Sequence, residues 1–151
     1  MKPKQIRPIA ICVFLNGDRI FVAEGYDPNK KETFYRPLGG EISFGELSRD
    51  CIIREIKEEM GEEIKDLKYL DLMENRFVYD GKSNHEIVLV YEALFVDPHL
   101  YQVESVKCQE DDGLEFTAWW KPISEFREGR IPLYPEGMLD LLDQWRKKRS
   151  S

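Results

Sequence analysis

The chain has 151 residues, of which 42% are hydrophobic and 34% charged, and its formal net charge is −7. A chain of this size and composition buries a core of its own, so we expect a single domain over residues 1–151. The acidic balance disfavours a stable nucleic-acid partner, which a basic surface would bind, and no apolar run approaches the length of a membrane span.

The cysteines form an odd set of three, Cys12, Cys51 and Cys108, without the paired spacing of a metal site. Such a set is typical of chains that keep free thiols in a reducing compartment. We therefore expect buried thiols and a cytoplasmic location.

The N-terminal segment has basic residues before a short apolar run, which is also how a secretory leader begins. Pro8 interrupts the run and no small-residue cleavage site follows, so we predict a strand over residues 9–15 instead. The turn signal Asn16-Gly17-Asp18 favours a returning strand over residues 19–24. A polar loop at 26–33 and a short strand at 34–38 then lead to Gly39-Gly40, where the backbone can approach a ligand closely.

The next segment has the periodicity of an amphipathic helix over residues 48–60. Ser48 is the expected N-cap, and Gly61 is the residue type expected just past the C-terminus. Ile53, Ile56 and Met60 form the predicted apolar stripe. The helix should therefore pack on a sheet while its adjacent face carries charge.

The remaining elements are predicted by alternation, turn residues and a second helical stripe. In chain order they are a strand at 67–73, a hairpin of 76–79 and 86–95 buried on both faces at 87–90, a polar loop at 97–113, a strand at 116–120, a short helix or turn at 122–126, and a helix from Pro135 with the stripe Met138, Leu141, Leu142 and Trp145. Together they predict an α/β fold with a mixed sheet and helices on its faces.

The predicted first helix carries a dense group of carboxylates. Glu55, Glu58 and Glu59 stand at i, i+3 and i+4, so they project from one side of a helix and repel one another. A cation normally resident among them would remove that cost. Ligands that offer only oxygen and full negative charge suit a hard ion such as Mg²⁺ or Mn²⁺ rather than zinc.

The segment from Gly40 to Glu62 resembles the signature of the Nudix hydrolases, in the MutT-like sense. The pattern is Gly-x5-Glu-x7-Arg-Glu-apolar-x-Glu-Glu-x-Gly-apolar, and this chain matches it with Gly40, Glu46, Arg54, Glu55, Ile56, Glu58, Glu59 and Gly61. Glu62 departs from the apolar residue expected last, which leaves Ile64 to anchor the chain there. The resemblance implies the Nudix fold, an α/β/α sandwich with a mixed central sheet.

The resemblance also implies roles for these residues. Glu58 and Glu59 would bind the metal, and Glu55 would be a catalytic base or a further ligand. Arg54 would orient a glutamate through charge-assisted hydrogen bonds. The remaining implied metal contacts are Glu46, which supports or completes the metal shell, and a backbone carbonyl of Gly39 or Gly40.

Candidate substrate contacts are less specific. They are Arg36 and Arg76 for phosphate, Tyr79 for a base, and His85 and Glu86 at the start of the long second hairpin strand; Phe34, Tyr35 and Phe77 could also stack, although strand aromatics more often fill cores. The acidic residues at 110–112 and Glu115 are interpreted as solvated loop carboxylates rather than as the extra ligand that some relatives supply.

The implied function is Mg²⁺-dependent hydrolysis of a phosphoric anhydride in a nucleoside diphosphate derivative, such as a nucleoside triphosphate or a dinucleoside polyphosphate, with Mn²⁺ as a substitute. The alternative is a nucleotide-binding sensor of the same fold that does not hydrolyse its ligand. Sensors usually lack some of the signature glutamates, and this chain keeps them all. The resemblance further implies a small-molecule nucleotide substrate and a homodimer.

Overall fold

The computed structural model of the protein describes residues 4–150. In chain order its elements are β1 (Ile6–Val13), β2 (Leu15–Asn16), β3 (Arg19–Asp27), β4 (Glu32–Arg36), β5 (Leu38–Glu41), α1 (Ser48–Met60), β6 (Ile64–Tyr79), β7 (Lys82–Phe95), the 3-10 helix η1 (Pro98–Tyr101), β8 (Ser105–Gln109), β9 (Glu115–Pro122), α2 (Ile123–Arg127) and α3 (Met138–Ser150).

The strands form two sheets. The first has the order β5-β1-β7-β6 and is mixed, because β1 runs parallel to β7 while β5 and β6 run antiparallel to their neighbours. The second has the order β2-β3-β9-β8, with β4 also paired to β3, and is antiparallel throughout. The predicted mixed sheet is therefore the first of the two.

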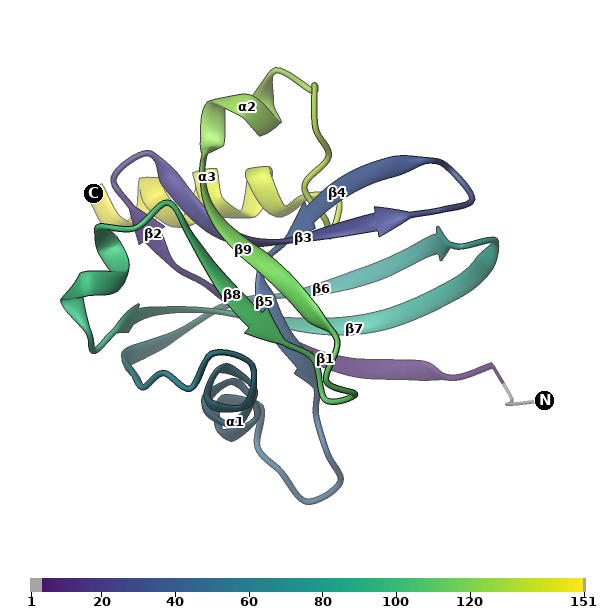
Figure 1. The fold of residues 1–151 in the computed structure, drawn as a ribbon, viewed down its shortest axis with the longest axis horizontal. Helices are drawn as coiled ribbons and strands as arrows, with labels where there is room; N and C mark the ends of the chain where they lie inside the picture. Colours follow the sequence, from purple (N-terminus) through teal and green to yellow (C-terminus); the bar gives the residue numbers. More distant parts are fainter. Residues whose placement is uncertain (1–3, 151) are drawn as a thin grey trace.

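Helices cover the sheets from opposite sides. Figure 1 shows α1 below the strands, α2 above them, and α3 level with the upper strands β2 and β3. The core divides in the same way: one cluster packs with Cys51, Ile52 and Ile56 of α1, and the other with residues of α2 and α3. The predicted fold class, an α/β/α sandwich, is confirmed.

Strand β1 shows how one segment serves both clusters. Ala10 and Cys12 face the α1 cluster, whereas Ile11 and Val13 face the α2–α3 cluster. Successive side chains of a strand point to opposite faces, so an unbroken apolar run is what a strand between two helical layers requires. The three cysteines are free and buried, as predicted.

Helix α1 begins one residue earlier than its expected cap implies. Its N-cap is Leu47 rather than Ser48, and no side chain caps it. The Ser48 hydroxyl instead forms a 2.6 Å hydrogen bond with the hydroxyl of Tyr91, which anchors the first turn to β7. The other end agrees with the prediction: Gly61 has φ 73°, and its N–H donates to the carbonyl of Lys57 at 2.8 Å.

The predicted apolar stripe of α1 is wrong at one position. Ile53 is 39% exposed, whereas Ile52 is fully buried beside Ile56. The buried face also includes Glu55 and Glu59. The helix is therefore rotated about its axis so that its acidic side faces the core more than the apolar residues alone predict.

Three other elements differ from the sequence analysis. The strand at 67–73 is part of one long strand, β6, and the polar loop at 97–113 contains η1 and β8. In β7 the side chains alternate, with Val88 and Val90 buried and Ile87 and Leu89 half-buried, so it is not buried on both faces. The last helix starts at Met138, after the loop that contains Pro135.

Among the described residues, no helix is long and apolar enough to span a membrane.

The position of Ile52 gives a stability prediction. Ile52→Ala should lower the free energy of unfolding by about 2–5 kcal/mol, because it leaves a cavity in the α1 cluster. Ile53→Ala is the matched control on the same helix and should change it by less than about 1 kcal/mol. Urea denaturation measures both. Equal losses in the two variants would contradict the orientation of α1 described above.

Candidate active site

The glycines of β5 allow the closest approaches in the site. A Cβ atom on Gly39 would lie 2.0 Å from the carbonyl oxygen of Ala10 on the adjacent strand β1. A Cβ atom on Gly40 would lie 2.3 Å from the carboxyl carbon of Glu55. Gly39 therefore admits no side chain unless the backbone shifts, and a side chain on Gly40 would displace the carboxylate of Glu55.

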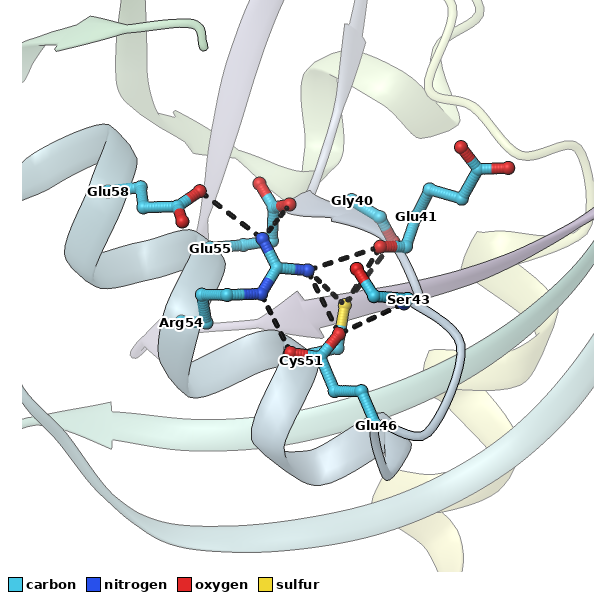
Figure 2. Close-up of polar contacts among 8 residues, drawn as sticks. All are labelled: Gly40, Glu41, Ser43, Glu46, Cys51, Arg54, Glu55 and Glu58. Carbon is cyan, nitrogen blue, oxygen red and sulfur yellow. Dashed lines mark hydrogen bonds and ion pairs between the residues drawn. The ribbon is translucent and has the colours of Figure 1, made fainter.

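Arg54 holds the acidic side chains around this turn (Figure 2). Its Nε and Nη2 donate to the two carboxylate oxygens of Glu46 at 2.7 and 2.9 Å, a bidentate pair. Its Nη1 donates to Glu55 at 2.9 Å and to Glu58 at 3.3 Å, and Nη2 also reaches the carbonyl of Glu41 at 3.3 Å. One guanidinium therefore fixes three carboxylates.

The position of Glu46 is that of a support for Arg54. Besides Arg54, it accepts a hydrogen bond from the backbone N–H of Ser43 at 3.1 Å. The hydrogen bonds from Arg54 and Ser43 lower the pKa of Glu46 to about 2, so it stays ionised. Glu46 does not line the cavity between the two sheets that is described below. The structure thus joins Glu46 to the arginine rather than to the other carboxylates.

The carboxylates that do meet are Glu55, Glu58 and Asp111. One oxygen atom of each lies within 4.8 Å of the other two, a spacing that could hold a metal ion. Asp111 comes from the loop between β8 and β9, and β8 packs against α1. The sequence analysis interpreted the acidic residues at 110–112 as solvated, because the pairing of β8 with β9 that positions this loop is not visible in a local pattern.

Glu59, like Glu55, is a buried carboxylate of the helix. The residue is 8% exposed, and its Oε1 has no hydrogen-bond partner among the described residues. Burial, and then the charges of Glu55 and Glu110, raise the pKa of Glu59 to about 9. Burial also raises the pKa of Glu55, although Arg54 opposes that effect.

These residues fit a divalent cation. An unpartnered, buried carboxylate oxygen is costly without a counterion, and it lies beside further oxygen ligands. The donors are all oxygens, which Mg²⁺ and Mn²⁺ prefer. Glu55, Glu58, Glu59 and Asp111 are the residues that would hold it.

Glu55, Glu59 and Asp111 line a cavity of about 940 Å³ between the two sheets, whereas the predicted ligand Glu58 does not line it. Of the predicted site residues, its lining includes Arg36, Gly39, Gly40, Arg54, Glu55, Glu59, Arg76, Tyr79 and Glu86. His85 does not line it: alternation along β7 turns His85 to the opposite face from Glu86, where it borders a second hollow. The structure therefore separates these two adjacent candidates.

The far end of the cavity has an aromatic wall. Phe34 contacts Tyr79 and Tyr134 with ring centroids 6.1 and 5.6 Å apart. The hydroxyl of Tyr79 donates to the carbonyl of Tyr26 at 3.1 Å. Tyr134 was not recognised from the sequence, because it follows the second sheet by a long connection and carries no local motif.

Asp27 lines the cavity and joins the two sheets beside it. A single carboxylate oxygen accepts the backbone N–H groups of Asn29, Lys30 and Asp80 at 3.0, 3.2 and 3.2 Å. Although burial opposes it, these bonds lower the pKa of Asp27. Asp27 thereby ties the β3–β4 turn of one sheet to the β6–β7 turn of the other.

Comparison with known proteins gives the family. The sequence model of the NUDIX domain matches residues 5–142. The chain therefore belongs to the NUDIX domain family.

Two curated relatives illustrate the sequence similarity. NAD-capped RNA hydrolase NudC of Pseudomonas aeruginosa is 24% identical over 77% of this chain, and the protein of the same name from Pseudomonas fluorescens is 28% identical over 77%. The matches cover 36% and 37% of those proteins, so this chain spans little more than a third of their length.

Solved structures share the fold. A MutT NUDIX hydrolase from Burkholderia pseudomallei superposes with a TM-score of 0.66 at 18% identity, over 91% of this chain and 97% of that one. A NUDIX hydrolase from Nitrosomonas europaea gives 0.63 at 15% identity, over 95% and 90%.

The raised pKa of Glu59 predicts a pH dependence of stability. Because the folded state holds this proton up to about pH 9 and the unfolded chain releases it near 4.5, the folded state binds more protons in between. Without divalent metal, this group should therefore lower stability progressively from about pH 4.5 to 9. Glu59→Gln should remove that loss, so its melting temperature should exceed the parent's by a margin that grows with pH.

The control for this measurement is Glu62→Gln, which lies just beyond the same helix and outside the cavity. Its melting temperature should track the parent's at every pH. Added Mg²⁺ should narrow the difference between Glu59→Gln and the parent at alkaline pH. A constant difference across this range, with and without metal, would show that Glu59 is not a strained carboxyl.

Proposed function

We propose that the protein hydrolyses a pyrophosphate bond in a nucleoside diphosphate derivative with the help of Mg²⁺. The observation that supports this most is the buried, unpartnered oxygen of Glu59 beside the Glu55–Glu58–Asp111 group, at the end of a cavity of about 940 Å³. The cavity has the size of small-molecule sites, which bury most of their ligand. The full set of signature glutamates favours a hydrolase over a sensor.

The residues of the chain have distinct roles in this proposal. Glu58, Glu59 and Asp111 hold the cation with their oxygens, and Mn²⁺ can replace Mg²⁺ there. Arg36 lines the cavity near Glu59 and would pair with a phosphate oxygen. A bound Mg²⁺ would neutralise the phosphate oxygens and lower the pKa of a water next to them.

Glu55 is the proposed general base. Its carboxylate touches the backbone of Gly40 and is held by Arg54 at 2.9 Å, so its direction is fixed. Its raised pKa brings it closer to neutral pH, where a base both accepts and releases a proton. Glu46 would act through Arg54, as a positioning residue rather than as a metal ligand.

The names of the curated relatives do not settle the substrate, since the chain matches only about a third of their length. We infer a small nucleotide rather than a nucleic-acid chain, because a net charge of −7 gives no basic surface for a polymer. All parts of the proposed site lie in one domain. The homodimer and the cytoplasmic location stay predictions.

The proposal predicts metal dependence. EDTA should abolish release of phosphorylated products from nucleoside diphosphate derivatives, and Mg²⁺ or Mn²⁺ should restore it. Glu55→Gln should lower kcat by about 10² to 10⁴, the usual cost of losing a general base. Glu59→Gln should in addition raise the metal concentration needed for half-maximal rate.

Glu62→Gln again serves as the control and should keep the parent's kcat and metal requirement. Products identified by mass distinguish pyrophosphate cleavage from loss of a terminal phosphate. Full turnover in chelator, or near-normal turnover of Glu59→Gln, would contradict the proposed site.

The aromatic wall predicts a second kinetic effect. Tyr79→Ala removes an aromatic ring that lines the cavity far from the carboxylates, so it should raise KM about tenfold or more for every nucleotide while kcat changes little. His85→Ala is the matched control from the same hairpin, on the opposite face, and should leave KM unchanged. A shift in KM for His85→Ala alone would place the substrate in the other hollow.

A further inference from the structure

A row of polar side chains crosses the floor of the cavity. Glu86 on β7 is paired directly with Arg7 on β1 and with Asn75 on β6. Residues directly opposite each other on neighbouring strands point to the same face of a sheet. All three line the cavity, so the row Arg7–Glu86–Asn75 is presented to whatever occupies it.

The carboxylate in the middle of this row is buried and only half used. Glu86 is 8% exposed, and its Oε2 accepts from Nη2 of Arg7 at 2.5 Å. Among the described residues, no hydrogen bond reaches its Oε1. The next row toward the carboxylate cluster is apolar, with Ile9 beside Val88.

Burying a carboxylate in such surroundings is costly unless it is paired. Arg7 supplies one pairing and fixes the orientation of Glu86. The remaining acceptor faces the cavity, where a ligand N–H group can reach it. This arrangement is that of a preorganised hydrogen-bonding site rather than of a structural ion pair alone.

The row lies about as far from the proposed metal centre as the base of a nucleotide lies from its phosphates. Gly40, which touches Glu55, is paired with Ala10, three residues along β1 from Arg7 and two strands away from Glu86. That is about 10 Å along the strands and about 10 Å across them. A nucleoside diphosphate with its phosphates at Glu55 and Glu59 can extend its base to this row.

We propose that Arg7 and Glu86 recognise the Watson–Crick edge of guanine in the nucleotide substrate. The row offers N–H donors from Arg7 next to the carboxylate of Glu86, whose Oε1 is open and whose Oε2 keeps a second lone pair beside its bond from Arg7. Guanine presents the complement in the same order: the O6 acceptor, the N1–H donor and the 2-amino donor. The inference rests on the proposed function, because it names the base of the substrate of that same site.

The other bases match the row less well. Adenine has one donor group on this edge and sets its N1 lone pair against the carboxylate. Cytosine has one donor followed by two acceptors, and uracil has its single N–H between two carbonyls. A site built around a substrate N–H group favours bases that carry it, since an analogue without it leaves the acceptor without that hydrogen bond in the complex.

Equilibrium binding of the nucleoside monophosphates tests the proposal without any hydrolysis. Titration calorimetry of the full chain with Mg²⁺ should give a dissociation constant for GMP about tenfold or more below that for IMP, which differs only by the missing 2-amino group. AMP, CMP and UMP should bind more weakly still. Equal binding of GMP and IMP would overturn the proposal whatever the variants show.

Glu86→Gln replaces one acceptor oxygen by an N–H₂ group of the same shape. It should weaken GMP binding by about 10- to 100-fold and narrow the GMP-to-IMP difference. Glu74→Gln, on the exposed face of the neighbouring strand, is the control and should keep both constants. Melting curves verify that the variants are folded. A guanine preference unchanged in Glu86→Gln would also overturn the proposal.

The two proposals fail separately. Guanine-selective binding without metal-dependent hydrolysis would remove the proposed function and leave the recognition row. Metal-dependent hydrolysis with no preference among purine bases would keep the proposed function and remove the recognition row. The base would then be held by the aromatic wall alone.

Discussion

The structure of the site depends on one guanidinium held among carboxylates. Arg54 is bound to Glu46 at two points and to Glu55 and Glu58 at one each. Without a cation these side chains would repel one another, and one ionic partner cannot neutralise them all. Glu59 lies beyond its reach, which is why burial and neighbouring charge keep a proton on that group. The incomplete neutralisation leaves a site suited to a second cation.

Helix α1 has to satisfy two demands with one surface. Its buried side includes Ile52 and Ile56 together with Glu55 and Glu59, so the core and the acidic cluster share the same turns. Apolar packing against β1 therefore fixes where the carboxylates lie, and the glycines of β5 bring the backbone against them. A small rotation of the helix would bury Ile53 and withdraw Glu59, so the stability of the core and the geometry of the site are coupled.

The sequence predicted the parts of this arrangement that are local or periodic. The helix, its end at Gly61 and the carboxylate spacing followed from a few residues. Ser48 and Ile53 were misplaced because the partner that decides each, Tyr91 or the α1 cluster, lies elsewhere in the chain. Asp111 reaches the cluster only through the pairing of β8 with β9. Motif spacing carries no information about such long-range contacts.

Asp27 shows how a polar contact can join the two sheets at a place where apolar packing would close the cavity. Apolar side chains join the two sheets elsewhere, but beside the cavity they would fill the space that a ligand needs. Asp27 joins the sheets there instead, since one oxygen gathers N–H groups from both turns while occupying the volume of a single carboxylate. Tyr79 adds a second link through the carbonyl of Tyr26. The cavity can therefore stay open between two firmly connected walls, with the carboxylate cluster at one end and the aromatic rings at the other.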